Sequence, residues 1–237
     1  MEFWGITDKG AVRSQNQDAY TLRELSDGMA LAIVCDGMGG ARAGNVASAM
    51  TIEIFTEAVD TMGGEPGERL GQAAIRANEL VFHRAVVDDD CAGMGTTLVA
   101  ALVGEGKADL INVGDSRAYH ISEKGIRQIT RDHSVVEDLV KSGRLTREEA
   151  RNHPRKNLIT RALGCEPQLR ADLFSEPVET GDFLLLCSDG LSNLVAEQEI
   201  LYEVLHGGPA DTCCRRLLDI ALHRGAPDNV TVALVRC

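Results

Sequence analysis

Residues 29–40 read MALAIVCDGMGG, an apolar run that stops abruptly at Asp36 and continues into glycines. An uninterrupted apolar run is typical of a buried strand, and the Asp-Gly pair that follows it is typical of a turn. A carboxylate at the rim of a core is costly unless something positive meets it. This stretch therefore predicts a core strand whose end carries a charge that needs a cationic partner.

Three more aspartates stand next to apolar runs, in INVGDSRAY (Asp115), LLLCSDGL (Asp189) and APDNVTVALV (Asp228). A single Asp beside Gly, Ser or Asn most often marks only a turn. Four of them at strand ends predict instead a shared cation. Oxygen ligands without His or Cys partners favour Mg²⁺ or Mn²⁺ over Zn²⁺ or Cu²⁺.

The bulk composition predicts one soluble domain spanning residues 1–237, since 44% of the chain is apolar and 25% is charged. A net charge of −12 argues against nucleic acid or an anionic membrane as the main partner. The seven cysteines contain no C-x-x-C pair, which favours a reducing compartment. The N-terminus resembles no signal peptide and no apolar run is long enough to span a bilayer, so we expect a cytoplasmic protein.

The order of elements predicts antiparallel sheets covered by helices. Short strands fill residues 1–36, and the connections between the next four strands are too short for crossover helices. Residues 132–157 are polar and predict a surface flap, with a capping box at Thr146 and Glu149. The remaining expected elements are helices at 41–61, 68–87, 196–206 and 209–224, and strands at 96–103, 108–113, 117–121, 125–130, 183–187 and 230–236.

Spacing excludes three other sites. The glycine-rich residues 37–44 are followed by Asn45 and Val46, where a phosphate-binding P-loop needs Lys and Ser or Thr. A calcium loop starting at Asp88 would place Ala92 and Val99 at ligand positions. No cysteine is followed six residues later by the Arg of a cysteine-dependent phosphatase.

A series of short strings, in this order, resembles the metal-dependent serine/threonine protein phosphatases of the type 2C family. They are RSQNQD at 13–18, VCDGMGG at 34–40, GTT at 95–97, NVGDSR at 112–117, DHS at 132–134, TRALG at 160–164, CSDGL at 187–191 and DNVT at 228–231. The compact length and the GMGG variant are similar to bacterial members. The resemblance implies an α+β fold, a sandwich of two antiparallel sheets flanked by helices.

The resemblance also implies a ligand set for two Mn²⁺ or Mg²⁺ ions and a third. Asp36 would bridge two ions, with the Gly37 carbonyl on one of them and Asp189 and Asp228 on the other. Asp115, together with Asp189, would serve the third ion.

The same resemblance assigns supporting roles. Arg13 would grip the substrate phosphate, because its planar fork of donors suits two phosphate oxygens. Asp18 would accept hydrogen bonds from metal-bound water. Asn229 would orient Asp228 or, alternatively, cap a turn.

Met38 departs from some eukaryotic members, which carry a His there as a proposed general acid. Methionine donates no useful proton. His133 is a candidate substitute, although a lone His after Asp is more often a structural hydrogen-bonder. His133 and Ser134 belong to the flap, which we expect to influence substrate access. We also expect Thr96 and Thr97 to hydrogen-bond within a strand and Arg117 to pair with a carboxylate.

The leading hypothesis is a bacterial phosphatase that hydrolyses phosphoserine and phosphothreonine with a metal-activated water and opposes Ser/Thr protein kinases as a monomer. One alternative is a pseudophosphatase that binds phosphoproteins without hydrolysis. Another is a phosphatase dedicated to anti-sigma-factor antagonists. Metal-dependent turnover of p-nitrophenyl phosphate separates the first two.

Overall fold

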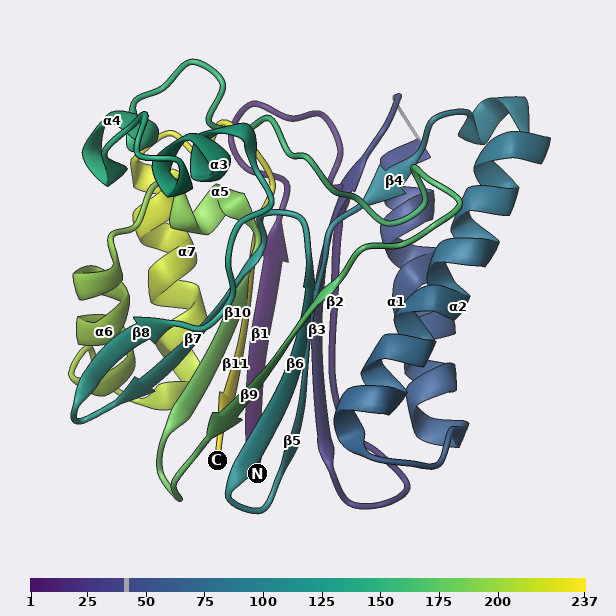
Figure 1. Cartoon of the computed structure of the whole chain (residues 1–237). Helices are drawn as coiled ribbons and strands as arrows, with labels where there is room; N and C mark the ends of the chain where they lie inside the picture. The colour runs from purple at the N-terminus through teal and green to yellow at the C-terminus, as the bar shows by residue number, and fades with distance from the viewer. Residues whose placement is uncertain (41–42) are drawn as a thin grey trace.

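Two antiparallel sheets face each other between two pairs of helices. The computed structural model describes residues 1–40 and 43–237. In Figure 1, α1 (Ala43–Thr61) and α2 (Pro66–Val87) cover one outer face, and α6 (Glu197–Leu205) and α7 (Cys213–His223) cover the other. The predicted α+β sandwich is therefore confirmed. The helix expected at 41–61 has its first two positions outside the described residues.

Every strand pairing within the two sheets is antiparallel. The first sheet runs β1 (Glu2–Asp8), β11 (Val230–Arg236), β10 (Phe183–Cys187), β7 (Arg117–Ser122), β8 (Gly125–Gln128). The second runs β2 (Asp18–Glu24), β3 (Ala30–Met38), β5 (Leu98–Gly104), β6 (Lys107–Val113), β9 (Asp172–Pro177), with β4 (Gly95–Thr96) pairing with β3. Sequence analysis did not predict β9.

The opening run of residues 29–40 is apolar without interruption because both faces of β3 are buried. Leu31 and Ile33 point into the cluster beneath α1 and α2. Ala32 and Val34 alternate with them and point into the cluster between the two sheets. A strand covered on both faces loses the usual alternation of apolar and polar residues. A third cluster lies between the first sheet and α6 and α7.

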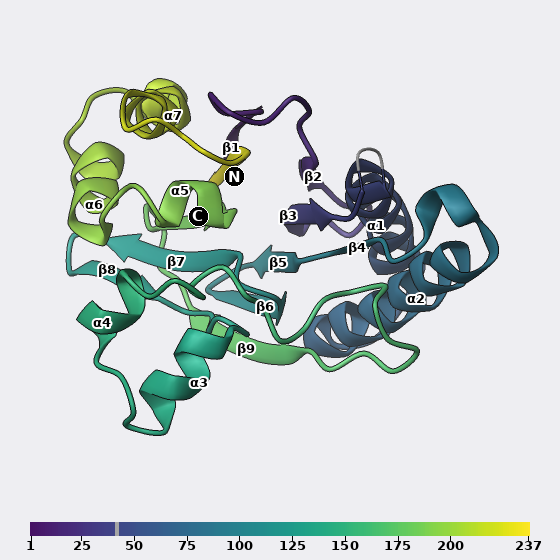
Figure 2. The ribbon, with the colours of Figure 1, turned by 90° about the horizontal axis from the view of Figure 1, so that it is seen from above.

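The flap predicted at 132–157 contains two short helices, α3 (Val135–Lys141) and α4 (Arg147–Arg151). In Figure 1 they lie at the top of the molecule, and seen from above in Figure 2 they lie apart from the two helix layers. The predicted capping box is confirmed, since Thr146 Oγ1 accepts the Glu149 amide at 3.2 Å and Glu149 Oε2 accepts the Thr146 amide at 2.8 Å.

Two further observations concern the cysteines and the length of the helices. All seven cysteines are free. Among the helices that the structure describes, none has both the length and the apolar character needed to cross a membrane. Three short helices complete the described elements: η1 (Asp89–Cys91), α5 (Asp189–Ser192) and η2 (Ala210–Thr212).

Candidate metal centre

The topology brings the four predicted aspartates to one end of the sandwich. Asp36 lies near the end of β3, and Asp115 follows β6. Asp189 begins α5 just after β10, and Asp228 immediately precedes the stretch that leads into β11. Since β11 is antiparallel to β10, the end of one strand lies beside the start of the other.

The aspartates lie close enough to repel one another. Burial raises the pKa of Asp36 well above its usual value, and repulsion from Asp18, Asp189, Asp115 and Asp228 raises it further. The pKa of Asp115 is also raised well above its usual value, by burial first and by repulsion from Asp189 second. The pKa of Asp189 is raised to about 6, by burial first and by Asp228 second. A divalent cation would relieve this shared destabilisation.

Two carboxylate oxygens support the fit of a cation. Oδ1 of Asp18 and Oδ1 of Asp189 are buried and have no hydrogen-bond partner among the described residues. Buried polar atoms are rarely left unpaired, and an all-oxygen set suits Mg²⁺ or Mn²⁺. Within residues 1–40 and 43–237, no three acidic, His or Cys side chains already stand at metal-ligand spacing. Asn193 donates to the other oxygen of Asp189, over 3.0 Å.

Backbone contacts fix Asp36 and the residue after it. The Asp36 amide donates to Thr97 Oγ1 over 2.9 Å, and Thr96 Oγ1 donates to the Asp36 carbonyl over 2.9 Å. Both threonines therefore hydrogen-bond to the neighbouring strand β3, and Thr97 interrupts the strand expected at 96–103 by lying between β4 and β5. A Cβ on Gly37 would lie 2.1 Å from the carbonyl oxygen of Gly44, so this close approach requires glycine.

Asp18 lies beneath the cluster. Its Oδ2 accepts hydrogen bonds from Ser188 Oγ, at 2.7 Å, and from Thr231 Oγ1, at 2.6 Å. Burial raises its pKa to about 7 against the effect of these two bonds. The other carboxylate oxygen, Oδ1, has no hydrogen-bond partner among the described residues and is free to meet a cation or a water molecule.

Arg13 contacts one of the aspartates and is itself exposed to solvent. Its Nη2 lies 2.7 Å from Oδ2 of Asp228, and its side chain is 55% exposed. The hydrogen bond with Asp228 and the charge of Asp228 are the main causes that raise the pKa of Arg13. The charges of Asp36 and Asp189 raise it further. An exposed guanidinium beside an acidic cluster can hold a phosphate where the cluster holds cations.

Asn229 holds Asp228 as expected, through its backbone amide, which donates to Oδ1 of Asp228 over 2.9 Å. Its side chain donates to the carbonyl oxygens of Lys9 and Gln15, at 3.0 and 2.9 Å, and accepts the Gln17 amide at 2.8 Å. The side chain of Asn229 therefore also fastens the loop that carries Arg13, a second role that the sequence did not predict. These partners lie more than 200 positions away in the chain, so no local pattern could reveal them.

The flap residues named from the sequence are buried at the start of that segment. Ser134 Oγ caps α3 by accepting the Glu137 amide at 3.2 Å. His133 is 5% exposed and its Nδ1 accepts the amide of Gly114. Burial lowers the pKa of His133. Arg117 forms the expected pair, a two-pronged contact with Asp132 at 2.6 to 3.1 Å.

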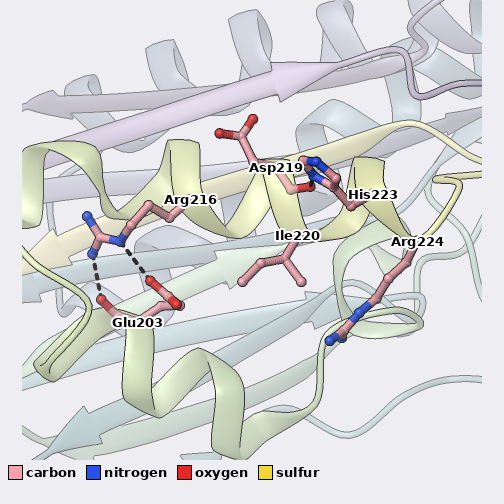
Figure 3. A pocket seen from close by; sticks show the side chains of 6 residues that line it. All are labelled: Glu203, Arg216, Asp219, Ile220, His223 and Arg224. Carbon is pink, nitrogen blue, oxygen red and sulfur yellow. Dashed lines mark hydrogen bonds and ion pairs between the residues drawn. The ribbon is translucent and has the colours of Figure 1, made fainter.

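Two of the cavities on the surface of the described residues bear on the location of the site. One of about 550 Å³ begins at Met38, beside the aspartates, and runs along the flap past Lys141 and Arg170. The other, of about 430 Å³, lies between α6 and α7 and is lined by none of the four cluster aspartates; Figure 3 shows its lining residues. Its cations are already paired, Arg216 with Glu203 and Arg224 with an acid of α6. Met38, which lines the first cavity, follows Asp36 by two positions in β3, so this cavity is the one that begins near the cluster.

Comparisons with known proteins identify the family. Residues 10–216 match the family model described as protein phosphatase 2C. The chain belongs to the protein phosphatase 2C family. It is 40% identical over 238 residues to the serine/threonine phosphatase stp of Listeria monocytogenes, covering 97% of this chain and 93% of that protein. It is 38% identical to the serine/threonine protein phosphatase PstP of Mycobacterium tuberculosis, covering 99% of this chain and 44% of that protein.

Solved structures show the same fold. The serine/threonine phosphatase Stp1 from Staphylococcus aureus superimposes with a TM-score of 0.93 at 36% identity, covering 100% of this chain and 94% of that one. The catalytic domain of the phosphatase PstP, solved in complex with two manganese ions, gives a TM-score of 0.87 at 36% identity, covering 98% of this chain and 96% of that one. This protein phosphatase 2C chain is thus a metal-dependent serine/threonine protein phosphatase of bacterial type, as the sequence predicted.

Proposed function

We propose that this phosphatase forms a single catalytic domain over residues 1–237 and removes phosphate from phosphoserine and phosphothreonine proteins in the cytoplasm. Its substrates would include proteins phosphorylated by bacterial Ser/Thr kinases, and the kinases themselves. We propose further that it acts as a monomer.

The contact between Arg13 and Asp228 carries this proposal. A metal site alone needs only carboxylates, whereas a phosphate monoester carries negative charge that must be met beside the ions. The 2.7 Å contact lies at the edge of the carboxylate cluster, where the guanidinium of Arg13 would be available to bind two phosphate oxygens. Arg13 is therefore positioned to orient a phosphoryl group against the site.

Each residue of the cluster has a proposed task. Asp36, the Gly37 carbonyl, Asp189 and Asp228 would hold two Mn²⁺ or Mg²⁺ ions, and Asp115 would share Asp189 for a third. When bound, such ions lower the pKa of water and neutralise charge on the phosphoryl oxygens. Manganese in the PstP structure supports this assignment by family relationship.

Three residues complete the proposal. Arg13 would bind and orient the phosphate, and Asp18 would accept a proton or hydrogen bond from water at the site through its unpaired Oδ1. His133 would not protonate the leaving group, because its Nδ1 already accepts the Gly114 amide. With Met38 in the other candidate position, the leaving-group proton must come from water at the site.

The flap would control which substrates reach the site, because its helix α3 and Ile159 line the cavity that begins at Met38. His133 and Ser134 would contribute by anchoring the flap. Replacing residues 135–157 with the flap of another family member should change peptide preference while leaving hydrolysis of p-nitrophenyl phosphate intact. Unchanged peptide preference would count against this role.

The experiment for the proposed function is hydrolysis of a phosphothreonine peptide by metal-stripped protein. Turnover should appear on addition of Mn²⁺, vanish in excess chelator, and be absent in Asp36→Asn. Peptide binding without turnover under all metal conditions would instead support the pseudophosphatase. Selective activity on a phosphorylated anti-sigma-factor antagonist, with none on kinase-phosphorylated proteins, would support the other alternative.

A further inference from the structure

Two hydrogen bonds join His133 to Gly114, the residue directly before Asp115. The Gly114 amide donates to Nδ1 of His133 over 3.1 Å. In return, the His133 amide donates to the Gly114 carbonyl over 2.9 Å. His133 is 5% exposed, so little water competes for these bonds. The pair fastens the turn after β6 to the first residues of the flap.

The other ring nitrogen fixes the tautomer. Because Nδ1 accepts a hydrogen bond, the ring proton resides on Nε2. Nε2 lies 3.2 Å from Oδ2 of Asp172 and 3.1 Å from Nη1 of Arg161. Because Nε2 carries the proton and a guanidinium cannot accept one, Asp172 is the acceptor of the two. Oδ1 of Asp172 accepts from Arg161 Nη1 over 2.7 Å, which keeps the carboxylate charged and in place. Asp172 therefore holds His133 with its acceptor nitrogen toward Gly114.

The turn needs this support because it carries a repelled carboxylate. Asp115 is 8% exposed and faces the negative charges of Asp189 and Asp132. Gly114 has a φ of +104°, and a Cβ there would lie 2.6 Å from Cγ2 of Thr97. No side chain can be added at position 114 to anchor the turn, so its polar backbone atoms must be held by neighbours.

We propose that His133 is a positioning residue for Asp115. By accepting the Gly114 amide, it holds the turn that directs the Asp115 carboxylate toward Asp189. The inference rests on the proposed function, in which these two aspartates share a third ion. His133 acts through the backbone of another residue and contacts neither substrate nor the reacting atoms.

Two near-isosteric substitutions test this role. In His133→Asn, the amide oxygen takes the place of Nδ1 and can still accept from Gly114. In His133→Gln, the terminal amide takes the place of Nε2, which retains contact with Asp172 and loses the acceptor for Gly114. The flap histidine His153 provides the matched control, because its Nδ1 accepts from Arg155 and not from a residue of the site.

Two measurements test the positioning role of His133 without relying on turnover. Hydrogen exchange of the Gly114 amide is followed by NMR in metal-free protein, and bound Mn²⁺ is counted by electron paramagnetic resonance during titration. His133→Gln should speed Gly114 exchange about tenfold or more. It should also raise the free Mn²⁺ needed for the third ion about tenfold. His133→Asn and His153→Gln should stay within about twofold of the wild type on both measurements.

Equal Gly114 exchange in His133→Asn and His133→Gln, whether both slow or both fast, would overturn the proposal. So would faster exchange in His133→Gln with an unchanged third ion. A wild-type protein that binds two ions and no third would remove the third site from the proposed function. The exchange rates would still decide separately whether His133 holds the turn.

Discussion

Gly190 lies against the carbonyl oxygen of Asn229, so closely that a Cβ on Gly190 would be 1.9 Å from that oxygen. This approach presses the first turn of α5 onto the segment that leads into β11. Asp189 and Asp228 directly precede the two residues in contact, so the approach also brings these carboxylates together. Gly190 is thus required for the geometry of the site, in addition to being typical of a turn.

Gly190→Ala should therefore separate the two ligands. The added methyl group cannot be placed without moving backbone, which costs about 1–3 kcal/mol of unfolding free energy. We expect weaker Mn²⁺ binding by calorimetry and a lower urea midpoint. Gly67→Ala is the matched control, because among the described residues no atom lies within 4 Å of its Cβ position. Equal, small effects of the two substitutions would show that the close approach is unimportant.

Arg13→Ala should reduce activity while sparing the metal ions. Loss of a charge-assisted hydrogen bond of roughly 1.5–3 kcal/mol predicts a fall in kcat/KM of about 10- to 100-fold on a phosphothreonine peptide. Mn²⁺ affinity should hold or rise, since Asp228 loses its competing partner. Arg84→Ala, which removes a surface pair with Asp88, should change neither quantity. A matching loss of Mn²⁺ binding in Arg13→Ala would refute a phosphate-binding role.

The metal-free protein should lose stability as pH rises. The pKa of Asp18 is about 7 in the fold and 3.8 in the unfolded chain, so the folded state binds its proton more tightly. The unfolding free energy should therefore fall across the window between these values, and Asp36, Asp115 and Asp189 act in the same direction.

Urea unfolding at about pH 5.5 and about pH 8 measures this linkage. Asp18→Asn should flatten the dependence, and saturating Mn²⁺ should reverse it, because cations favour the charged carboxylates. Greater stability of the metal-free protein at the higher pH would show that the carboxylates are not mutually destabilising.

The pair of Arg117 and Asp132 should matter for stability at the base of the flap. Arg117→Met leaves Asp132, whose side chain is 14% exposed, without its cation and near Asp115. We expect a loss of about 3 kcal/mol in unfolding free energy. The double variant Arg117→Met/Asp132→Leu should recover part of it, because both charges are then removed. A double variant no more stable than the single one would mean that packing, not charge, dominates.

Strands buried on both faces were predictable almost to the residue. The expected boundaries 183–187 and 230–236 coincide with β10 and β11, because each is an apolar run bounded by turn residues. β9 escaped prediction for the opposite reason. It carries Asp172, Ser175 and Glu176, ends at Pro177, and among the described strands pairs with β6 alone. An edge strand of this kind has no apolar run to reveal it.

The residues of the metal centre also differ in whether the local sequence predicts them. Asp36, Asp189 and Asp228 are visible in the sequence because each interrupts a pattern set by its own strand. The contacts of Asn229 and the bond between His133 and Gly114 depend on loops that only the topology brings together. Local sequence can therefore identify candidate ligands, whereas the residues that position them require the fold.

Crystals grown with MnCl₂ would test the central claim most directly, through anomalous scattering from manganese. The account predicts two strong peaks in contact with Asp36, one of them also contacting Asp189 and Asp228, and a weaker peak beside Asp115. Full catalytic activity of the same preparation with no manganese peak among these aspartates would contradict it.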